Sequence, residues 1–540
     1  MVVSRSVVAL RSADGRPAMS EEPVPAASAR TSRGGESPRR RPRRVAGSIS
    51  QPPWRRLVNP YRPVEVLRPE QLEAIHDAAM RILESTGLEF MSDEALSILA
   101  AGGAEVDRAT KRVRFDRHLV AELVAKAPER FTLHARNPAH SVEIGGESVV
   151  FCAVSGAPNC SDLDRGRRPG SFADFCDLLR LVQSLDIIHL AAGYPVEPID
   201  LPPATRHLDA HLAYITLTDR VWQPSAIGPH RIEDGIAMNC IARGIDRDEL
   251  ATRPGLLTTV NTNSPLRVDA AMSDGLTAMA RAGQAVVVTP FTLSGAMAPA
   301  TLAGALALQN AEALGVIAFA QLVREGAPVL YGGFTSNVDM KSGAPAFGTP
   351  EYVRAAMAGG QLARRYNLPY RSSNACAANA VDAQAAYESE MSIWGAVMGG
   401  ANMVMHGAGW MEGGLVASFE KLVVDAEMLQ MMAEFLQPIV VDEDTLGLSA
   451  IAEVGPGGHF FGAAHTLARY ETAFYAPILS DWRNFENWRL AGAKDTAQRA
   501  NEIWKQLLAE YQQPPLDPAI DEALRDFVAM RKAQGGVPAA

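Results

Sequence analysis

Short apolar runs alternate with longer amphipathic stretches from residue 149 to residue 435 of this 540-residue chain. The apolar runs, which predict strands, are residues 149–154, 187–192, 221–226, 256–261, 285–291, 328–334, 369–374 and 402–406. The amphipathic stretches, which predict helices, are residues 171–185, 204–216, 231–243, 268–282, 301–323, 350–366, 382–398 and 419–435. Strands separated by helices pair in parallel through crossovers. Eight such units, over a span close to the ~250 residues typical of the fold, predict an α/β protein with a (β/α)8 barrel, or TIM barrel.

The structural alternative is an open, doubly wound sheet. Such sheets usually carry a glycine-rich phosphate loop after an early strand. The sequence contains neither a GxGxxG nor a GxxxxGK[ST] motif, so the closed barrel is favoured.

The rest of the chain divides by composition into three further parts. Residues 1–50 are rich in Ser, Pro, Gly and Arg, and the lack of apolar periodicity predicts a disordered, Arg-rich tail. Its arginines could contact RNA, anionic lipid or an acidic protein, although a solvated tail is the simpler interpretation. Residues 51–148 predict an N-terminal α/β lead-in to a catalytic barrel domain at 149–436. Residues 437–540 predict a helical C-terminal extension that packs on the barrel.

The composition also excludes several classes of protein. A formal net charge of −10 argues against a chain that binds nucleic acid over its whole surface. A hydrophobic content of 47% with 21% charged residues is typical of a globular protein rather than a disordered or fibrous one. The most apolar helix candidate, residues 301–323, contains Gln309, Asn310 and Glu312, so we expect a buried helix and no membrane span. Five scattered cysteines without a CxxC pair, and no apolar secretory segment, favour a cytoplasmic location.

Polar and aromatic residues gather where the predicted strands end, which is where barrel enzymes place their chemistry. These residues are Ser155, Gly156, Tyr194, Gln223, Asn261, Asn263, Phe291, Phe334, Ser336, Asn337, Arg371, Asn374, His406 and Trp410. The ring is short of carboxylates, and the nearest, Glu412, lies beyond the last strand. Such a rim suits a small zwitterion, with Arg371 binding a carboxylate and aromatic faces holding a quaternary ammonium. The alternatives are a structural ion pair for Arg371 and core packing for each aromatic ring.

No metal site is expected. His459 and His465 are six residues apart without a nearby cysteine pair, which fits no standard zinc arrangement. We expect these histidines to order the C-terminal segment.

Several long stretches of the sequence carry a family resemblance. They are residues 331–339, 342–351, 382–384 with 387–388, 400–410, 455–460 and 465–466. Over residues 60–510 the chain resembles the corrinoid-dependent trimethylamine methyltransferase family, and in particular its members without pyrrolysine, such as those acting on glycine betaine. The resemblance implies that a methylated amine donates a methyl group to the Co(I) of a separate corrinoid protein, which docks over the barrel mouth. It also implies that the chain itself binds no cofactor tightly and acts as a homo-oligomer.

The founding members of that family carry pyrrolysine, which this chain lacks. The residue that replaces it is expected near Phe334 or within Asn374–Cys376. Neutral trimethylamine would have to expel an amide-like anion, and therefore needs an activating group. A quaternary ammonium needs none, because loss of a methyl group releases a neutral tertiary amine. We therefore expect a quaternary substrate such as glycine betaine, proline betaine or carnitine, with a trimethylamine-type donor as the alternative, and catalysis mainly by positioning.

Residue roles follow from this hypothesis. Arg371 would bind the carboxylate, and Phe334 and Trp410 would face the ammonium. Asn261 or Asn263 would make polar contacts. His406 is the catalytic candidate, holding a water molecule or the methyl-bearing end in line, and its alternative is a core histidine. Two other functions remain open: a betaine-binding sensor without transfer activity, and a barrel lyase or isomerase of a small acid that uses Glu412 or His406 as base.

Overall fold

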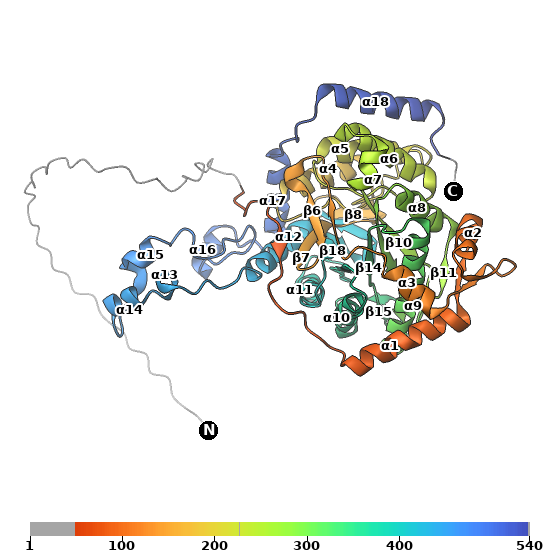
Figure 1. Cartoon of the computed structure of the whole chain (residues 1–540). Coiled ribbons are helices and arrows are strands. Elements are labelled where there is room, and N and C mark those ends of the chain that lie inside the picture. Colours follow the sequence, from red (N-terminus) through yellow and green to blue (C-terminus); the bar gives the residue numbers. More distant parts are fainter. Residues whose placement is uncertain (1–48, 226, 538–540) are drawn as a thin grey trace, which may run out of the picture. The chain divides into compact units, whose positions relative to one another are not determined.

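Eight parallel segments close into a barrel in the computed structural model, which describes residues 49–225 and 227–537 (Figure 1). Six of them are strands: β7 (Ser148–Ala153), β10 (Leu257–Thr262), β12 (Ala285–Pro290), β14 (Val329–Gly332), β17 (Tyr370–Ser373) and β18 (Met403–Ala408). Between β7 and β10 the ring continues through single parallel bridges that join Cys152 to Leu190, Leu190 to Val221 and Trp222 to Leu256. Because β18 also pairs in parallel with β7, the ring is closed. The predicted (β/α)8 fold is confirmed.

The eight barrel helices begin and end within two residues of the predicted positions. They are α4 (Phe172–Ser184), α5 (Arg206–Leu217), α6 (Pro229–Arg243), α8 (Ala270–Arg281), α9 (Leu302–Val323), α10 (Pro350–Arg365), α11 (Ala383–Met398) and α12 (Phe419–Phe435). Side-chain caps explain several starts: Ser171, Thr349 and Ser418 each accept a hydrogen bond from the backbone N–H three residues later. By length and composition α9 alone, among helices of the described residues, is apolar enough to span a membrane, but 83% of its apolar window is buried inside the protein.

The barrel is filled from its N-terminal end. A hairpin of β5 (Arg130–Leu133) and β6 (Val142–Gly145) places Leu133, Val142 and Ile144 in one apolar cluster with inward-facing residues of the barrel strands. All three side chains are at most 2% exposed. The space that remains for a ligand therefore lies toward the C-terminal ends of the strands.

The lead-in packs around this barrel. It consists of β1 (Leu57–Val58), α1 (Pro69–Arg81), a π-helical turn (Ile82–Thr86), β2 (Leu88–Phe90), α2 (Asp93–Ala101), β3 (Glu105–Asp107), β4 (Arg112–Arg114), α3 (Arg117–Val124) and a 3₁₀ turn (Pro138–His140). β2 joins β4, β3 and β11 (Arg267–Val268) in one small sheet. The predicted Arg-rich tail falls on residues that, up to position 48, lie outside the described part of the chain.

Loops after the strands form two further sheets at the barrel mouth. One contains β19 (Trp410–Met411), β20 (Val416–Ser418), β8 (Asn159–Asp162) and β9 (Gly166–Pro169), and the other contains β13 (Leu293–Ser294), β15 (Ser336–Val338) and β16 (Pro345–Ala346). The first sheet joins the loop after β7 to the loop after β18, since β8 pairs in parallel with β20. Because Trp410 belongs to β19, this sheet fixes the position of Trp410 at the barrel mouth.

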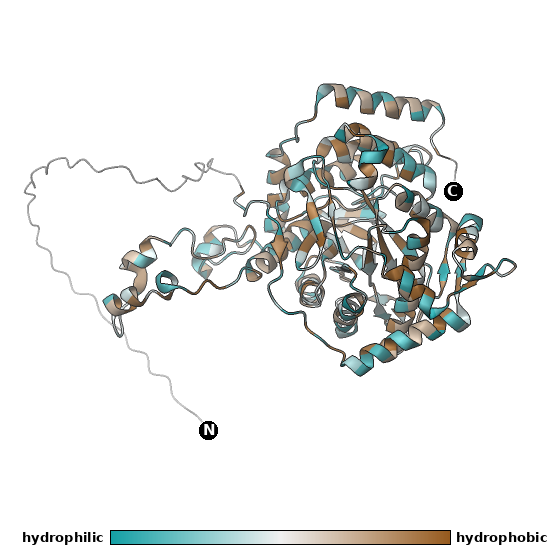
Figure 2. Cartoon of the chain, viewed as in Figure 1, coloured by the Kyte–Doolittle hydropathy of each residue, from teal (hydrophilic) through white to brown (hydrophobic). Residues whose placement is uncertain are grey.

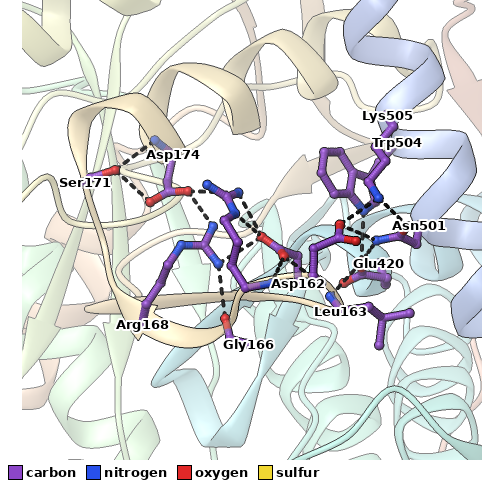
Figure 3. Close-up of polar contacts among 12 residues, drawn as sticks. Asp162, Leu163, Gly166, Arg168, Ser171, Asp174, Glu420, Asn501, Trp504 and Lys505 are labelled. Carbon is purple, nitrogen blue, oxygen red and sulfur yellow. Dashed lines mark hydrogen bonds and ion pairs between the residues drawn. The ribbon is translucent and has the colours of Figure 1, made fainter.

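The C-terminal segment ends in two helices that pack on the barrel helices, α17 (Thr496–Ala509) and α18 (Pro518–Ala533). Figure 3 shows how α17 is tied to the mouth: Glu420 accepts hydrogen bonds from Asn501 and Trp504 of α17 and from the Leu163 backbone of the β8–β9 turn. In the same network Arg168 pairs with Asp162 and Asp174. Between α12 and α17 lie α13 (Glu443–Leu446), α14 (Leu448–Val454), a 3₁₀ turn (Phe460–Gly462), α15 (Ala464–Leu467) and α16 (Phe485–Leu490). Residues of this intervening stretch are largely exposed.

Candidate active site

A pocket of about 420 Å³ opens at the C-terminal ends of the barrel strands. Its wall is made by Ser155, Gly156, Gly193, Tyr194, Glu197, Gln223, Pro224, Ser225, Ile227, Thr259, Asn261, Met272, Thr289, Phe291, Phe334, Arg371, Met405, His406, Trp410 and Gly414. The wall includes five of the six residues predicted for the site. The sixth, Asn263, lies outside the pocket wall, and its Oδ1 accepts the backbone N–H of Asp269, the N-cap residue of α8.

Arg371, on β17, is the cation of this pocket and is only 2% exposed. Its Nε and Nη1 are enclosed without a hydrogen-bond partner, and within residues 49–225 and 227–537 its guanidinium forms no ion pair. The guanidinium carbon lies 5.5 Å from the centroid of the Phe334 ring. Burial lowers the pKa of Arg371 to about 10, which leaves the group charged at neutral pH. A buried cation without a counter-charge is unfavourable, so this position favours an anionic group of a ligand.

Aromatic rings pack side by side along the same wall. The Phe334 ring lies 5.2 Å from Phe291 in a stacked arrangement and 6.0 Å from Trp410 edge to face. Trp410 in turn stacks on His406, with 5.5 Å between ring centroids. Trp410 and Phe334 are both at most 5% exposed, so each ring packs in the core and also borders the pocket. Core packing and a binding role are therefore not exclusive here.

His406 is held as a neutral ring. Its Nδ1 lies 3.3 Å from the backbone nitrogen of Ser155 and 3.4 Å from the Ser155 hydroxyl. Because a backbone N–H can only donate, Nδ1 accepts and the neutral ring carries its hydrogen on Nε2. Burial, together with the positive charge of Arg371, lowers the pKa of His406 to about 3. The ring therefore adds no positive charge to the pocket at neutral pH.

This pKa predicts a pH dependence of stability. The unfolded histidine has an ordinary pKa near 6.5, so between about pH 6.5 and pH 3 the unfolded chain binds more protons than the folded one. Stability is then lost as the pH falls through this window. We expect the free energy of unfolding of His406→Gln to fall less between pH 6.5 and pH 4 than that of the wild type, measured by urea titration at each pH. Burial also lowers the pKa of His189, to about 4, but His189 is present in both proteins and its effect cancels. Equal pH slopes would contradict the buried, neutral state of His406.

The carboxylates near the mouth are already paired. Glu412, the predicted base of the lyase alternative, forms an ion pair with Arg167 at 2.9 Å. Sequence reasoning missed Glu197, which lines the pocket and pairs with Arg206 at 2.7 Å. It also missed Thr259 and Thr289, although both alternate inward on predicted strands and that alternation was a usable signal.

A buried ion pair supports the loop between His406 and Trp410. Lys421 and Asp425 of α12 form the pair, and both side chains are fully buried. Asp425 Oδ2 accepts the backbone N–H of Gly409 at 2.8 Å, and Lys421 donates to the Ser389 hydroxyl at 2.6 Å. This places a fixed charge pair directly behind the pocket wall.

The described residues contain no group of three or more His, Cys, Asp or Glu side chains that could hold a metal ion. Of the two histidines considered as zinc ligands, His465 contacts the Asp444 backbone carbonyl at 3.2 Å, and His459 is exposed. Phe334 lines the pocket, whereas Asn374 and Cys376, which bound the other stretch expected to replace pyrrolysine, are fully buried and are not part of the pocket wall.

Comparison with known proteins identifies the family. The model described as trimethylamine methyltransferase (MTTB) matches residues 32–536. A glycine betaine methyltransferase of Desulfitobacterium hafniense (strain Y51) is 38% identical over 472 residues, which are 87% of this chain and 98% of the relative. The trimethylamine methyltransferase MttB of Desulfitobacterium hafniense (strain DSM 10664 / DCB-2) is 32% identical, and the match covers 87% of this chain and 94% of the relative. The monomethylamine methyltransferase of Methanosarcina barkeri superposes with a TM-score of 0.45 at 10% identity, over 83% of this chain and 93% of that chain. The chain belongs to the trimethylamine methyltransferase family and is a methyltransferase.

Proposed function

We propose that this protein transfers a methyl group from a carboxylated quaternary amine, such as glycine betaine, to the Co(I) of a corrinoid carried by a separate protein. The observation that carries the proposal is the buried and unpaired guanidinium of Arg371 on the wall of an aromatic-lined pocket. A carboxylate supplies the missing counter-charge, and the ammonium end of the same molecule is accommodated by aromatic faces. The relative that is named a glycine betaine methyltransferase supports this choice of substrate.

The chemistry needs no general acid or base. As the N–CH3 bond breaks, its electron pair stays on nitrogen, so a quaternary ammonium leaves as a neutral tertiary amine. The Co(I) acceptor supplies the electron pair of the new bond, and no proton moves. This balance agrees with a neutral His406 and with carboxylates that are engaged in ion pairs at the mouth.

The residues of the pocket then work by positioning. Arg371 fixes the carboxylate end deep in the barrel, which turns the opposite, methylated end toward the mouth. Trp410 and Phe334 enclose the ammonium and exclude water, and Asn261 offers a polar contact near the opening. His406 holds a water molecule through its Nε2–H, or its ring packs against the methyl-bearing end and keeps it in line. The corrinoid protein approaches over the mouth, and five free cysteines agree with transfer in the reducing cytoplasm.

The direct test is methyl transfer with purified components. The protein is mixed with a corrinoid carrier reduced to Co(I) and with glycine betaine, proline betaine, carnitine, choline or trimethylamine in turn, and the cobalt absorption spectrum is followed. Formation of methyl-Co(III) with a carboxylated betaine is the expected result. Transfer from trimethylamine alone would overturn the quaternary-substrate proposal. Tight betaine binding without transfer would favour a sensor.

Removal of the Phe334 ring is expected to weaken betaine binding. Phe334→Ala removes a desolvated aromatic face that contacts both the pocket and the Arg371 guanidinium, so we expect a loss of ~1–2 kcal/mol, about 5- to 30-fold in Kd, by calorimetry. Phe347→Leu is the matched control, because Phe347 lies 5.4 Å from Phe334 but is not part of the pocket wall. Equal losses in both variants would assign Phe334 to packing alone.

A further inference from the structure

Large apolar side chains are concentrated on the stretch between α12 and α17, residues 437–490, which we call the arm. Ile439, Phe461, Phe474 and Leu490 are between 82% and 88% exposed. Tyr470, Trp482 and Phe485 are 69%, 74% and 63% exposed. Figure 2 shows hydrophobic residues along the short helices of this stretch. Exposure on this scale is unusual for a surface that stays in water, and it marks an interaction site.

The arm is held by its own polar contacts and has almost no apolar core. Within residues 437–490 the buried positions are Gly447, Ala450, Ala463 and Leu479. Asp442 caps α13, and Asp444 forms an ion pair with Arg469. The far end is fixed to α12, where Glu427 accepts the backbone N–H groups of Ile478 and Leu479. Because these few contacts leave most of the apolar surface in water, burial of that surface against another chain would supply the missing stabilisation.

The exposed area fits a stable protein interface. Fully exposed aromatic side chains offer about 200 Å² each, so the five most exposed aromatic rings of the arm together present roughly 750 Å². A standard interface buries about 800 Å² on each partner. The arm alone therefore carries enough apolar surface for one side of such an interface.

Exposed apolar side chains are also present on two adjacent barrel helices of the same chain, α11 and α12. Tyr387 and Met391 of α11, together with Met431 and Phe435 of α12, are between 42% and 59% exposed. The Phe435 ring lies 5.2 Å from Tyr61, which extends the surface onto the strap before α1. We call the exposed residues Tyr387, Met391, Met431 and Phe435 the helix-pair face. Since this face precedes the arm in sequence, one chain carries both the apolar arm and an apolar face on which an arm could pack.

We propose that the arm packs on a second copy of this chain, and that two copies exchange arms across a two-fold axis so that each arm covers the helix-pair face of the other. A two-fold interface is satisfied by two different surfaces of one chain, because each contact occurs twice. A corrinoid carrier is the less suitable occupant. It must leave after each transfer, and transient interfaces are smaller and more polar than a surface of this kind. The proposal does not depend on which amine is the methyl donor.

The test is the mass of the full-length protein at micromolar concentration, by light scattering after size-exclusion chromatography. We expect the wild type at a multiple of 57.9 kDa, and the double variant Phe461→Ser/Phe474→Ser at or near the single-chain mass. The matched control is Leu163→Ser/Met340→Ser, which replaces residues 55% and 73% exposed that lie outside the arm and should keep the wild-type mass. A monomeric wild type overturns the proposal, including one that gains mass only with the corrinoid protein. A double variant of wild-type mass also overturns it.

A second measurement guards against loss of folding in the double variant. Far-ultraviolet circular dichroism should match the wild type, because both phenylalanines are more than 80% exposed in the single chain. Two copies with different tags are then co-expressed, one copy is captured by its tag, and the amount of the other copy that co-purifies is measured. We expect at least a tenfold loss when Phe461 and Phe474 are replaced in both copies. If Ile439→Lys/Val441→Lys and the phenylalanine double variant both co-purify at wild-type levels, the arm is not the interface.

Discussion

Arg371→Met is expected to weaken binding of carboxylated betaines by about 2–4 kcal/mol, or roughly 30- to 1000-fold in Kd, because a buried charge pair with the ligand carboxylate is lost. The effect on choline, which carries the same ammonium without a carboxylate, should be within a few-fold. Loss of the repulsion between the two cations acts in favour of choline binding, since the proposed site puts Arg371 and the ammonium in one pocket of about 420 Å³. Calorimetry with both ligands, and KM with the Co(I) carrier, measure the difference.

The same variant should have the opposite effect on the empty protein. Arg371 is 2% exposed and has no counter-charge among the described residues, so its burial opposes folding. Methionine fills a similar volume without a charge. We therefore expect the ligand-free variant to unfold at a temperature equal to or above that of the wild type. A structural ion pair, the alternative considered for Arg371, would instead make the variant less stable.

Arg371→Lys is the matched control for this pair of results. Lysine keeps the charge but not the planar fork that binds a carboxylate with two hydrogen bonds. An intermediate loss of betaine affinity is expected, with choline again nearly unaffected. Equal weakening of betaine and choline binding by Arg371→Met would remove Arg371 from the carboxylate role.

The barrel was predictable because its signal is repeated eight times along the chain. Hydrophobic runs give the positions of strands, and end caps such as Ser171 and Thr349 give helix starts. The runs at 187–192 and 221–226 nonetheless form only single bridges in the ring. A run of apolar residues reports burial, whereas ladder hydrogen bonds depend on the backbone path, and that path departs from a regular strand at Ala192, where φ is positive.

The site was only partly predictable for a related reason. Arg371, His406 and Trp410 follow from the rule that strand ends meet at the mouth. Asn263 also follows a predicted strand, but its side chain accepts a hydrogen bond from the Asp269 backbone at the start of α8 and does not line the pocket. Two other features depend on tertiary contacts that no local pattern records. One is the β8–β20 pairing, in which Cys160 pairs with Ala417, and the other is the buried Lys421–Asp425 ion pair.

Lys421→Met is expected to lower the free energy of unfolding by about 3–5 kcal/mol, because removal of one partner leaves the other charge buried and unpaired. Both side chains of the Lys421–Asp425 pair are fully buried, so water cannot solvate the remaining carboxylate. Urea or thermal unfolding monitored by circular dichroism measures the loss. A change below about 0.5 kcal/mol, the size typical of surface substitutions, would contradict the buried ion pair.

Double-variant analysis separates the charge from its hydrogen bonds. Asp425→Asn keeps an oxygen that can accept the Gly409 N–H, while it removes the negative charge. The combined Lys421→Met/Asp425→Asn variant contains no buried charge at this position, so it should recover much of the stability lost in Lys421→Met alone. Gly409 lies between His406 and Trp410, so Lys421→Met should also weaken betaine binding, and the combined variant should bind betaine more tightly than Lys421→Met. Recovery of stability without recovery of binding would show that the charge pair, and not only the Gly409 hydrogen bond, sets the position of the pocket wall.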